Sequence, residues 1–222
     1  MSFWIVPPGV LVDSPRAPGH STGQPHSGKY VRIADGREFV DIDPRELRNC
    51  LGHFTTGVTV VTCDVDGSPH GATVNAFSAV SLDPPLVLVS LDRRSKAARY
   101  LDGRPFTVNV LRSQQDALAL HFAGRPMPDA VPWAEPAHGS PRLADCLAHL
   151  SCRPWASYDG GDHVLHLGHV EELTYGGGAP LVFFRGQFRH LGPAFEAAPW
   201  LESGDCPGSL SRLIGGLTEA AH

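Results

Sequence analysis

The chain has 222 residues, 42% of them hydrophobic and 18% charged, which fits one soluble globular domain with a sizeable core. Its net charge of −5 argues against a partner that requires a basic surface, such as a nucleic acid or an anionic membrane. No run of about 20 apolar residues predicts a membrane span, and the N-terminus has no basic n-region of a signal peptide, so we expect a cytoplasmic protein.

Residues 1–40 are predicted to form an extended or partly disordered arm, because Pro, Gly, Ser and His dominate its first part. Within the arm, Tyr30-Val-Arg-Ile-Ala-Asp-Gly-Arg-Glu-Phe-Val40 could form a short hairpin that turns at Asp35-Gly36. Residues 41–193 are predicted to be the folded domain. Residues 194–222 are predicted to be a C-terminal tail that could form a loose helix, with Leu210–Leu217 apolar enough to pack.

The first clear element of the domain is a helix beginning at Asp43 and running to about His53. Asp at the N-cap and Pro at the first helical position together give a helix-start signal. The β-branched run Thr56–Cys63 then predicts a strand, and Asp66-Gly67 predicts the turn of a hairpin.

The stretch His70–Lys96 is the centre of the prediction. It reads as a strand (GATVNAF), a break at Asp83-Pro84-Pro85, an apolar strand (PLVLVSL) and a basic helix that opens at Asp92 and ends near Gly103. Small residues at Gly71, Ala72 and Ala76 would let a planar ring approach the backbone. Hydrogen-bonding residues near that ring would be Thr73, Asn75 and Ser78, and a phosphate would suit Ser90, Arg93, Arg94, Ser95 and Lys96. The alternative is that these are ordinary polar strand ends and a solvated helix face.

Further strands are predicted at Phe106–Leu111, from Cys146 to Arg153, at His163–Leu173 and at Pro180–Phe184. A capping box at Ser113–Asp116 predicts a helix through Phe122, and a long polar loop follows over residues 124–141, with Trp133 as lid or plug. The result is a mainly β chain with short helices, arranged as a Greek-key barrel.

The run Gly71-Ala-Thr-Val-Asn-Ala-Phe-Ser-Ala-Val-Ser-Leu-Asp-Pro-Pro85 resembles the G-x-T-x-N-S-F-x-S-V-S-x-x-P-P pattern of the flavin reductase-like family of FMN-binding split barrels. RNCLGHFTTGVTVVT and FTVNVL are similar to further parts of that pattern. Ala76 stands where the family often has Ser. The resemblance implies a Greek-key split β-barrel of the FMN-binding type, and a homodimer with flavin near the interface.

A second candidate site is Gly161-Asp162-His163. In the family that this chain resembles, G-D-H at this place is associated with NAD(P)H binding, with the histidine near the flavin. An imidazole at a strand start can also hydrogen-bond a carboxamide or a pyrophosphate. Gly-Asp is equally a plain turn signal. Metal binding by His163, His166 and His169 is disfavoured, because side chains alternate along a strand and His166 would point away from the other two.

The resemblance implies an NAD(P)H:flavin oxidoreductase that reduces FMN or FAD and supplies reduced flavin to a partner monooxygenase. Hydride transfer needs no acid, base or nucleophile from the protein, and none is obvious here. The expected flavin-binding residues are Thr73, Val74, Asn75, Ala76, Ser78, Ser90, Arg93, Ser95 and Lys96, and Asp162 with the catalytic His163 would place the nicotinamide. The alternatives are a split-barrel flavoprotein with a non-reductase role in a biosynthetic pathway, or a flavin carrier.

The five cysteines are odd in number and show no C-x-x-C pair, which favours reduced, mostly buried thiols over a disulfide framework or a zinc site.

Overall fold

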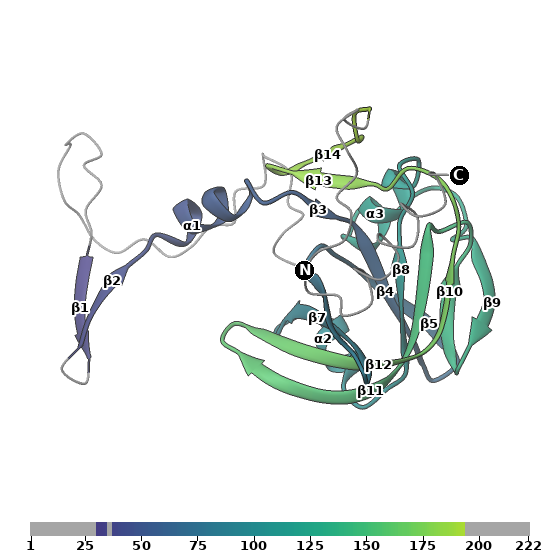
Figure 1. The fold of residues 1–222 in the computed structure, drawn as a ribbon, viewed down its shortest axis with the longest axis horizontal. Coiled ribbons are helices and arrows are strands. Elements are labelled where there is room, and N and C mark those ends of the chain that lie inside the picture. Colours follow the sequence, from purple (N-terminus) through teal and green to yellow (C-terminus); the bar gives the residue numbers. More distant parts are fainter. Residues whose placement is uncertain (1–29, 35–36, 194–222) are drawn as a thin grey trace, which may run out of the picture. The chain divides into compact units, whose positions relative to one another are not determined.

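The computed structural model describes residues 30–34 and 37–193 (Figure 1). The predicted hairpin turn at Asp35-Gly36, the first part of the arm and the predicted tail helix lie outside the described residues. Contacts divide the chain into two compact units at Leu191–Gly192. In the described part, no helix is long and apolar enough to cross a membrane.

Strands dominate the described residues, as predicted, and the helices are short. The helices are α1 (Pro44–Leu51), α2 (Lys96–Leu101) and α3 (Asp116–Phe122). The strands are β1 (Tyr30–Ala34), β2 (Arg37–Asp41), β3 (Thr56–Gly57), β4 (Thr59–Val65), β5 (Ser68–Val74), β6 (Phe77–Leu82), β7 (Pro85–Asp92), β8 (Phe106–Val110), β9 (Trp133–Ala137), β10 (Ser140–Leu143), β11 (Ala148–Gly160), β12 (His163–Tyr175), β13 (Val182–Phe184) and β14 (Gln187–Arg189).

A seven-stranded antiparallel sheet carries the fold, in the order β5-β4-β8-β11-β12-β7-β6. Three hairpins, β4-β5, β6-β7 and β11-β12, are joined by pairings between strands distant in sequence, such as β7 with β12. A three-stranded sheet, β14-β13-β3, and the hairpins β1-β2 and β9-β10 complete the strands. This long-range antiparallel pairing is what the predicted Greek-key arrangement requires.

The apolar core has two clusters, which the alternation of side chains along β4 separates. Val61 belongs to one cluster with Leu91, Phe106 and Cys152, whereas its neighbour Val60 belongs to the other. The second cluster also contains Val58, Leu111, Leu118, Ala119, Leu143 and Leu181. Ala98 and Leu101 of α2 join the first cluster, and Leu118 and Ala119 of α3 join the second. Helices α2 and α3 are therefore each held by the core cluster that they cover.

Two predicted turn and cap signals are confirmed. Asp43 is the N-cap of α1, and its Oδ1 accepts a hydrogen bond from the Arg45 N–H at 2.6 Å. Asp66 and Gly67 both have positive φ, +54° and +79°, as a tight hairpin turn requires.

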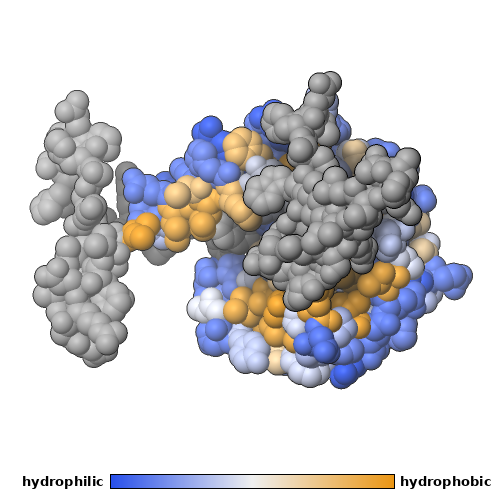
Figure 2. Space-filling view, in the orientation of Figure 1, coloured by the Kyte–Doolittle hydropathy of each residue, from blue (hydrophilic) through white to orange (hydrophobic). Residues whose placement is uncertain are grey.

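Helix α1 has no buried residue, although Leu47 and Leu51 lie four positions apart and so share one face. Each is 44% exposed, and Figure 2 shows an apolar area on this helix beside hydrophilic residues. Neither leucine belongs to a core cluster of the described residues.

Three local predictions were wrong. Helix α2 does not open at Asp92: its N-cap is Ser95, whose hydroxyl accepts from the Ala98 N–H at 3.0 Å. Helix α3 has no capping box, because its N-cap, Gln115, makes no side-chain cap bond. The predicted loop over residues 124–141 contains most of the hairpin β9-β10, and Trp133 packs against the second core cluster.

Candidate active site

Backbone hydrogen bonds bring three sequence-predicted segments together at one end of β6, β7 and β12. The Ser90 N–H donates to the Ala76 carbonyl at 3.0 Å, which joins the 73–78 segment to the 90–96 segment. The Arg93 N–H donates to the Asp162 carbonyl at 3.0 Å, which joins the 90–96 segment to the Gly161-Asp162-His163 turn. In the β7-β12 ladder, Ser90 lies opposite Leu165 and Asp92 opposite His163.

The side chains of Thr73 and Val74 are committed to the protein interior. Thr73 is 1% exposed, and its hydroxyl donates to the Ala119 carbonyl of α3 at 2.6 Å. Val74 is 2% exposed and belongs to the first core cluster. What these two residues can offer a ligand is their backbone. The side chains that follow are more open: Asn75 and Ala76 are half-buried and Ser78 is exposed.

The expected approach of a ligand ring to Gly71 and Ala72 is not what the structure shows. A Cβ at Gly71 would lie 2.7 Å from two ring carbons of Phe122, so an internal aromatic ring already covers this backbone. Ala72 is 7% exposed and belongs to the first core cluster. Of the three small residues singled out from the sequence, Ala72 is buried, whereas Gly71 and Ala76 are half-buried.

The predicted phosphate-binding residues differ in solvent exposure and in whether their side chains already make hydrogen bonds. Ser90 is half-buried, and its hydroxyl makes no hydrogen bond to another of the described residues. Ser95 is 5% exposed and its hydroxyl caps α2. Lys96 is exposed and lines a hollow of about 120 Å³ together with His70, Gly71 and Tyr100. Its ammonium is therefore placed to meet an anion from solvent.

Arginines 93 and 94 are engaged with carboxylates of the protein. Arg94 pairs with Asp92, Nη2 to Oδ2 at 3.1 Å, and Asp92 is 3% exposed. Burial alone would raise the pKa of Asp92, but the hydrogen bonds from Arg94 and its charge together lower that pKa. Arg93 donates from Nη2 to Oδ2 of Asp159 at 2.9 Å and from Nε to the Gly161 carbonyl at 3.1 Å.

The Gly161-Asp162-His163 turn orients an imidazole. Gly161 has φ +78°, which is readily adopted by glycine, and β12 begins at His163. The Nδ1 of His163 lies 2.7 Å from Oδ1 of Asp162. Because a carboxylate only accepts, Nδ1 carries the proton of a neutral ring and Nε2 is the acceptor. The His163 side chain is 13% exposed, so its ring is held in place yet reachable.

The other two histidines of β12 have partners of their own. His166 is 3% exposed, and its Nδ1 lies 3.1 Å from the Ser157 hydroxyl. His169 stacks on Trp155 with ring centroids 5.9 Å apart. In the described part of the chain, no group of three or more His, Cys, Asp or Glu side chains is arranged to hold a metal ion.

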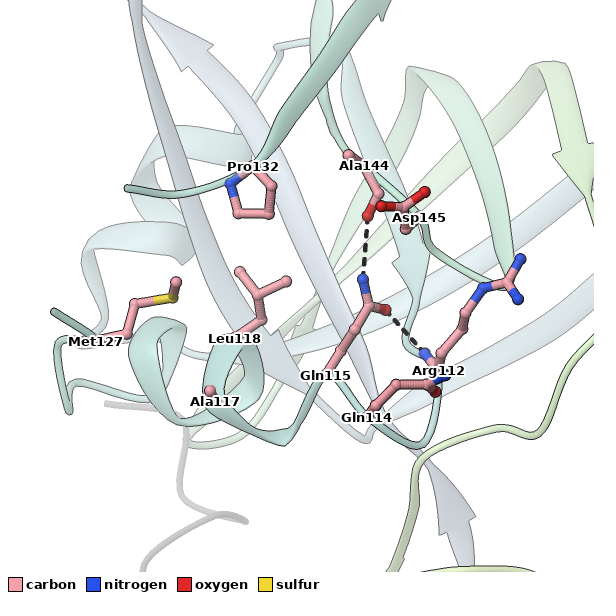
Figure 3. A pocket seen from close by; sticks show the side chains of 9 residues that line it. All are labelled: Arg112, Gln114, Gln115, Ala117, Leu118, Met127, Pro132, Ala144 and Asp145. Carbon is pink, nitrogen blue, oxygen red and sulfur yellow. Dashed lines mark hydrogen bonds between the residues drawn. The ribbon is translucent and has the colours of Figure 1, made fainter. Parts of the chain in front are cut away.

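A larger hollow of about 560 Å³ lies elsewhere, beside α3 (Figure 3). Leu118, Met127 and Pro132 form its apolar side. The Gln115 side chain accepts from the Arg112 N–H at 2.9 Å and donates to the Ala144 carbonyl at 3.0 Å, so its amide is already satisfied. None of the sequence-predicted site residues lines this hollow.

Sequence reasoning missed Asp159. Its Oδ1 accepts from the Gly161 N–H at 2.9 Å while its Oδ2 pairs with Arg93. The signal was present in Tyr158-Asp-Gly-Gly-Asp162, because an Asp two residues before a glycine turn often accepts from the backbone of that turn.

Comparison with known proteins assigns the chain to a family. The model of the family described as "Flavin reductase like domain" matches residues 51–192. An NADH-dependent flavin reductase from a Rhodococcus species is 44% identical over 165 residues, covering 72% of this chain and 93% of that protein. The reductase component of 4-nitrophenol 4-monooxygenase/4-nitrocatechol 2-monooxygenase from Rhodococcus opacus is 41% identical over 165 residues, covering 72% of this chain and 86% of its own length.

A solved structure is also similar. The NADH:FAD oxidoreductase SgcE6 of Streptomyces globisporus C-1027 superposes with a TM-score of 0.66 at 37% identity, covering 75% of this chain and 99% of that one. This likeness confirms the predicted fold class.

Proposed function

Because the chain belongs to the flavin reductase-like family, we propose that it is an NAD(P)H:flavin oxidoreductase that reduces FMN or FAD. The observation that carries the proposal is the hydrogen-bonded junction of residues 73–78, residues 90–96 and the Gly161-Asp162-His163 turn. The first two segments were predicted for the flavin and the third for the dinucleotide. Their junction is what a reaction between two stacked ring systems requires.

The residues present fit a flavin. Asn75 and Ala76 are half-buried beside the half-buried Ser90, whose N–H donates to the Ala76 carbonyl, and Lys96 is exposed. When bound, the flavin accepts a hydride from the reduced nicotinamide. The backbone of Thr73–Ala76 and the Asn75 and Ser78 side chains orient the ring. Ser90 and Lys96 bind the phosphate end.

His163 is proposed to orient the nicotinamide. Its Nδ1 is held by Asp162 at 2.7 Å, which fixes the ring plane and leaves Nε2 to face a ligand. An imidazole held this way can accept a hydrogen bond from the carboxamide of the nicotinamide. No proton transfer by the histidine is needed for hydride transfer, so its role is positioning and contact.

We further propose that the chain is a homodimer. Helix α1 leaves Leu47 and Leu51 44% exposed, and Phe54 just after it is 77% exposed. On the sheet, Val80 and Leu82 of the edge strand β6 and Trp155 and Tyr158 of β11 are exposed apolar side chains. A second copy that covers these residues would remove apolar surface from water.

The oligomeric state tests this part of the proposal. In light scattering coupled to gel filtration, the wild-type chain is expected to have twice the chain mass, and Leu47→Glu to shift it toward the monomer. Arg45→Glu changes charge on the opposite face of α1 and serves as the control. A wild-type monomer would contradict the homodimer.

The relatives' names connect such reductases to monooxygenases, and we propose the same use here: the reduced flavin leaves and supplies a partner monooxygenase. Because this chemistry draws on reduced nicotinamide, we place the protein in the cytoplasm. Addition of a flavin-dependent monooxygenase to the purified reductase should then couple NADH oxidation to substrate oxygenation.

The activity is tested by following the absorbance of NADH or NADPH with purified protein and added FMN, FAD or riboflavin. We expect turnover that depends on added flavin. Flavin binding without turnover would instead indicate a carrier. Lys96→Ala should weaken FMN binding but not riboflavin binding, because riboflavin lacks the phosphate. The control is Arg99→Ala, which removes another positive charge from helix α2. A lysine control is not suitable, because the chain's other lysine, Lys29, lies outside the described residues.

A further inference from the structure

We propose that Arg93 is a positioning residue for the dinucleotide: with Asp159 it clamps the Gly161-Asp162-His163 turn and so fixes the place of His163. The inference rests on the proposed function and departs from the expectation that Arg93 binds the flavin phosphate. It also gives a role to Asp159, which was not among the predicted site residues.

The contacts of Arg93 all lead to the turn. Its N–H donates to the Asp162 carbonyl at 3.0 Å, and its Nε to the Gly161 carbonyl at 3.1 Å. Its Nη2 donates to Oδ2 of Asp159 at 2.9 Å and approaches the His163 carbonyl at 3.4 Å. One residue at the end of β7 thus holds the last part of β11, the turn and the first residue of β12.

Asp159 closes the clamp from the other side. Its Oδ1 accepts from the Gly161 N–H at 2.9 Å, so each of its two oxygens has a separate donor. The Gly161 N–H and then the Arg93 guanidinium lower the pKa of Asp159. The carboxylate therefore stays ionised well into the acid range, and the clamp persists at neutral pH.

The turn needs such a clamp because it has little packing of its own. Gly161 and Asp162 are exposed, and β11 is exposed from Ser157 to Gly160. The imidazole of His163 is anchored to Asp162, a residue of the same turn. Any displacement of the turn therefore displaces the ring that we propose meets the nicotinamide.

A guanidinium suits this position better than an ammonium. Nε and Nη2 lie in one plane and donate to two different oxygens, the Gly161 carbonyl and the Asp159 carboxylate. A lysine could reach one acceptor but has no such fork. Arg93→Lys is therefore expected to restore the function only in part.

The experiment compares Arg93→Ala, Asp159→Ala and the double variant with wild type. We expect each single variant to raise the KM for NADH about tenfold, the double variant to add little beyond that, and Arg93→Lys to fall between. The matched control is Arg153→Ala, which removes a surface ion pair of the same 2.9 Å length, with Glu171, from the same strand pair. The control should leave the KM for NADH unchanged.

Two binding constants separate the clamp from phosphate binding. Quenching of flavin fluorescence gives the Kd for FMN and for riboflavin, and we expect Arg93→Ala to leave the ratio of the two unchanged. If the variant weakens FMN binding and spares riboflavin, Arg93 binds phosphate and the positioning role is overturned. An unchanged KM for NADH overturns it as well.

A third measurement does not depend on turnover. Amide hydrogen exchange at Gly161, whose N–H is bonded to Asp159, should be faster in Arg93→Ala and Asp159→Ala than in wild type or Arg153→Ala. Unchanged exchange would refute the clamp even in an active enzyme. If wild type fails to oxidise NADH with any flavin while these variants do loosen the turn, the proposed function fails and the clamp stands as a structural feature only.

Discussion

The ring of Phe122 lies against the backbone of Gly71 so closely that a Cβ at position 71 would be 2.7 Å from its Cδ1 and Cε1. Phe122 is the last residue of α3, and Gly71 lies within β5. The glycine therefore seats the helix on the sheet. The same helix also accepts the Thr73 hydroxyl at its Ala119 carbonyl, so β5 holds α3 at two points.

Gly71→Ala should destabilise the fold, because the new methyl group must push the Phe122 ring away. We expect a loss of about 1–3 kcal/mol of unfolding free energy, typical of overpacking. Urea titration followed by circular dichroism would measure it. Phe122→Leu in the same chain should recover part of the loss; equal destabilisation by Gly71→Ala in both backgrounds would contradict the contact.

Gly168→Ala should be more damaging. A Cβ there would lie 2.4 Å from Cζ of Phe106 and 2.8 Å from Cβ of Cys152, and both of these residues are almost fully buried. Because neither neighbour can move into solvent, we expect the free energy of unfolding to fall by about 3 kcal/mol, at the upper end for overpacking. Gly177→Ala, with nothing within 4 Å of the new atom, is the control. Similar stability of the two variants would argue against the crowding.

The comparison of these two glycines shows where sequence reasoning stops. Gly71 was recognised as a site of close approach, which was right, but the approaching ring was taken to be a ligand. Residues 71 and 122 are 51 positions apart in the chain, and only the tertiary fold reveals that α3 folds back onto β5. Gly168, within an apolar strand, gave no signal, because its constraint comes from Phe106 on β8, a strand that does not pair with β12.

His166 should make stability depend on pH. Burial lowers its pKa from the usual 6.5, so the unfolded chain binds a proton near that pH that the folded protein rejects. Unfolding free energy therefore falls as the pH decreases through 6.5, by up to about 1.4 kcal/mol per pH unit for one proton. His166→Gln should flatten the dependence between pH 7.5 and about 5, measured by urea titration at each pH.

The control for that comparison is His190→Gln, which removes one histidine at an exposed position. If the unfolding free energy of His166→Gln falls with decreasing pH as steeply as that of the wild type, the pKa of His166 is not lowered by folding.

Asn109 should be needed for stability. It is fully buried; its Nδ2 donates to the Val60 carbonyl at 2.8 Å, and its Oδ1 accepts from the Leu143 N–H at 2.9 Å. Asn109→Leu keeps the size of the side chain but leaves the Val60 carbonyl and the Leu143 N–H without a hydrogen-bond partner. We expect the free energy of unfolding to fall by about 3 kcal/mol. Chemical denaturation measures it. A loss below about 1 kcal/mol would mean that water or a shifted backbone replaces the amide.

Three thiols should be inert in the folded protein. Burial raises the pKa of Cys63 and Cys146 to about 11 and that of Cys152 to about 12. At pH 8 a thiol of pKa 11 is about one part in a thousand thiolate, and the thiolate is the reactive form. In the variant Cys50→Ser/Cys206→Ser, a disulfide reagent should label nothing until urea unfolds the chain, when three thiols should react. Labelling in native buffer would contradict this.

Local signals in the sequence predicted most of the strands and hairpins. Asp43-Pro44 marked the start of α1, and Asp66-Gly67 marked a turn whose residues indeed have positive φ. The same local signals misplaced two helix starts. Both Asp92 and Ser95 are suitable N-cap residues for α2, and Ser95 is the one used. The Gln115 side chain bonds the Arg112 N–H and the Ala144 carbonyl and does not cap α3. The β9-β10 hairpin was missed because Pro and charged residues hide its alternation.

The structure brings the three predicted segments of the candidate site together, but their individual contacts were not predictable. The Ser90 N–H donates to the Ala76 carbonyl, and the ladder between β7 and β12 places residues 90–92 beside His163. The Thr73 hydroxyl is taken up by α3, which lies 46 residues further along the chain, so the sequence around Thr73 could not show this contact. The Ser95 hydroxyl is taken up locally, as the N-cap of α2. The ion pair between Arg93 and Asp159 joins residues 66 positions apart, and the sequence does not indicate that pairing.

The contact between Gly168 and Phe106 also limits how this chain could diverge. A hypothetical Cβ at position 168 would meet the edge of the Phe106 ring, so a side chain can enter there only if position 106 first becomes smaller. The order of the two substitutions matters, since the reverse order passes through an overpacked intermediate. Cβ of Cys152 lies 2.8 Å from the same point, so strand β11 must shift as well. Aligned homologues should therefore keep glycine at position 168 wherever position 106 is aromatic.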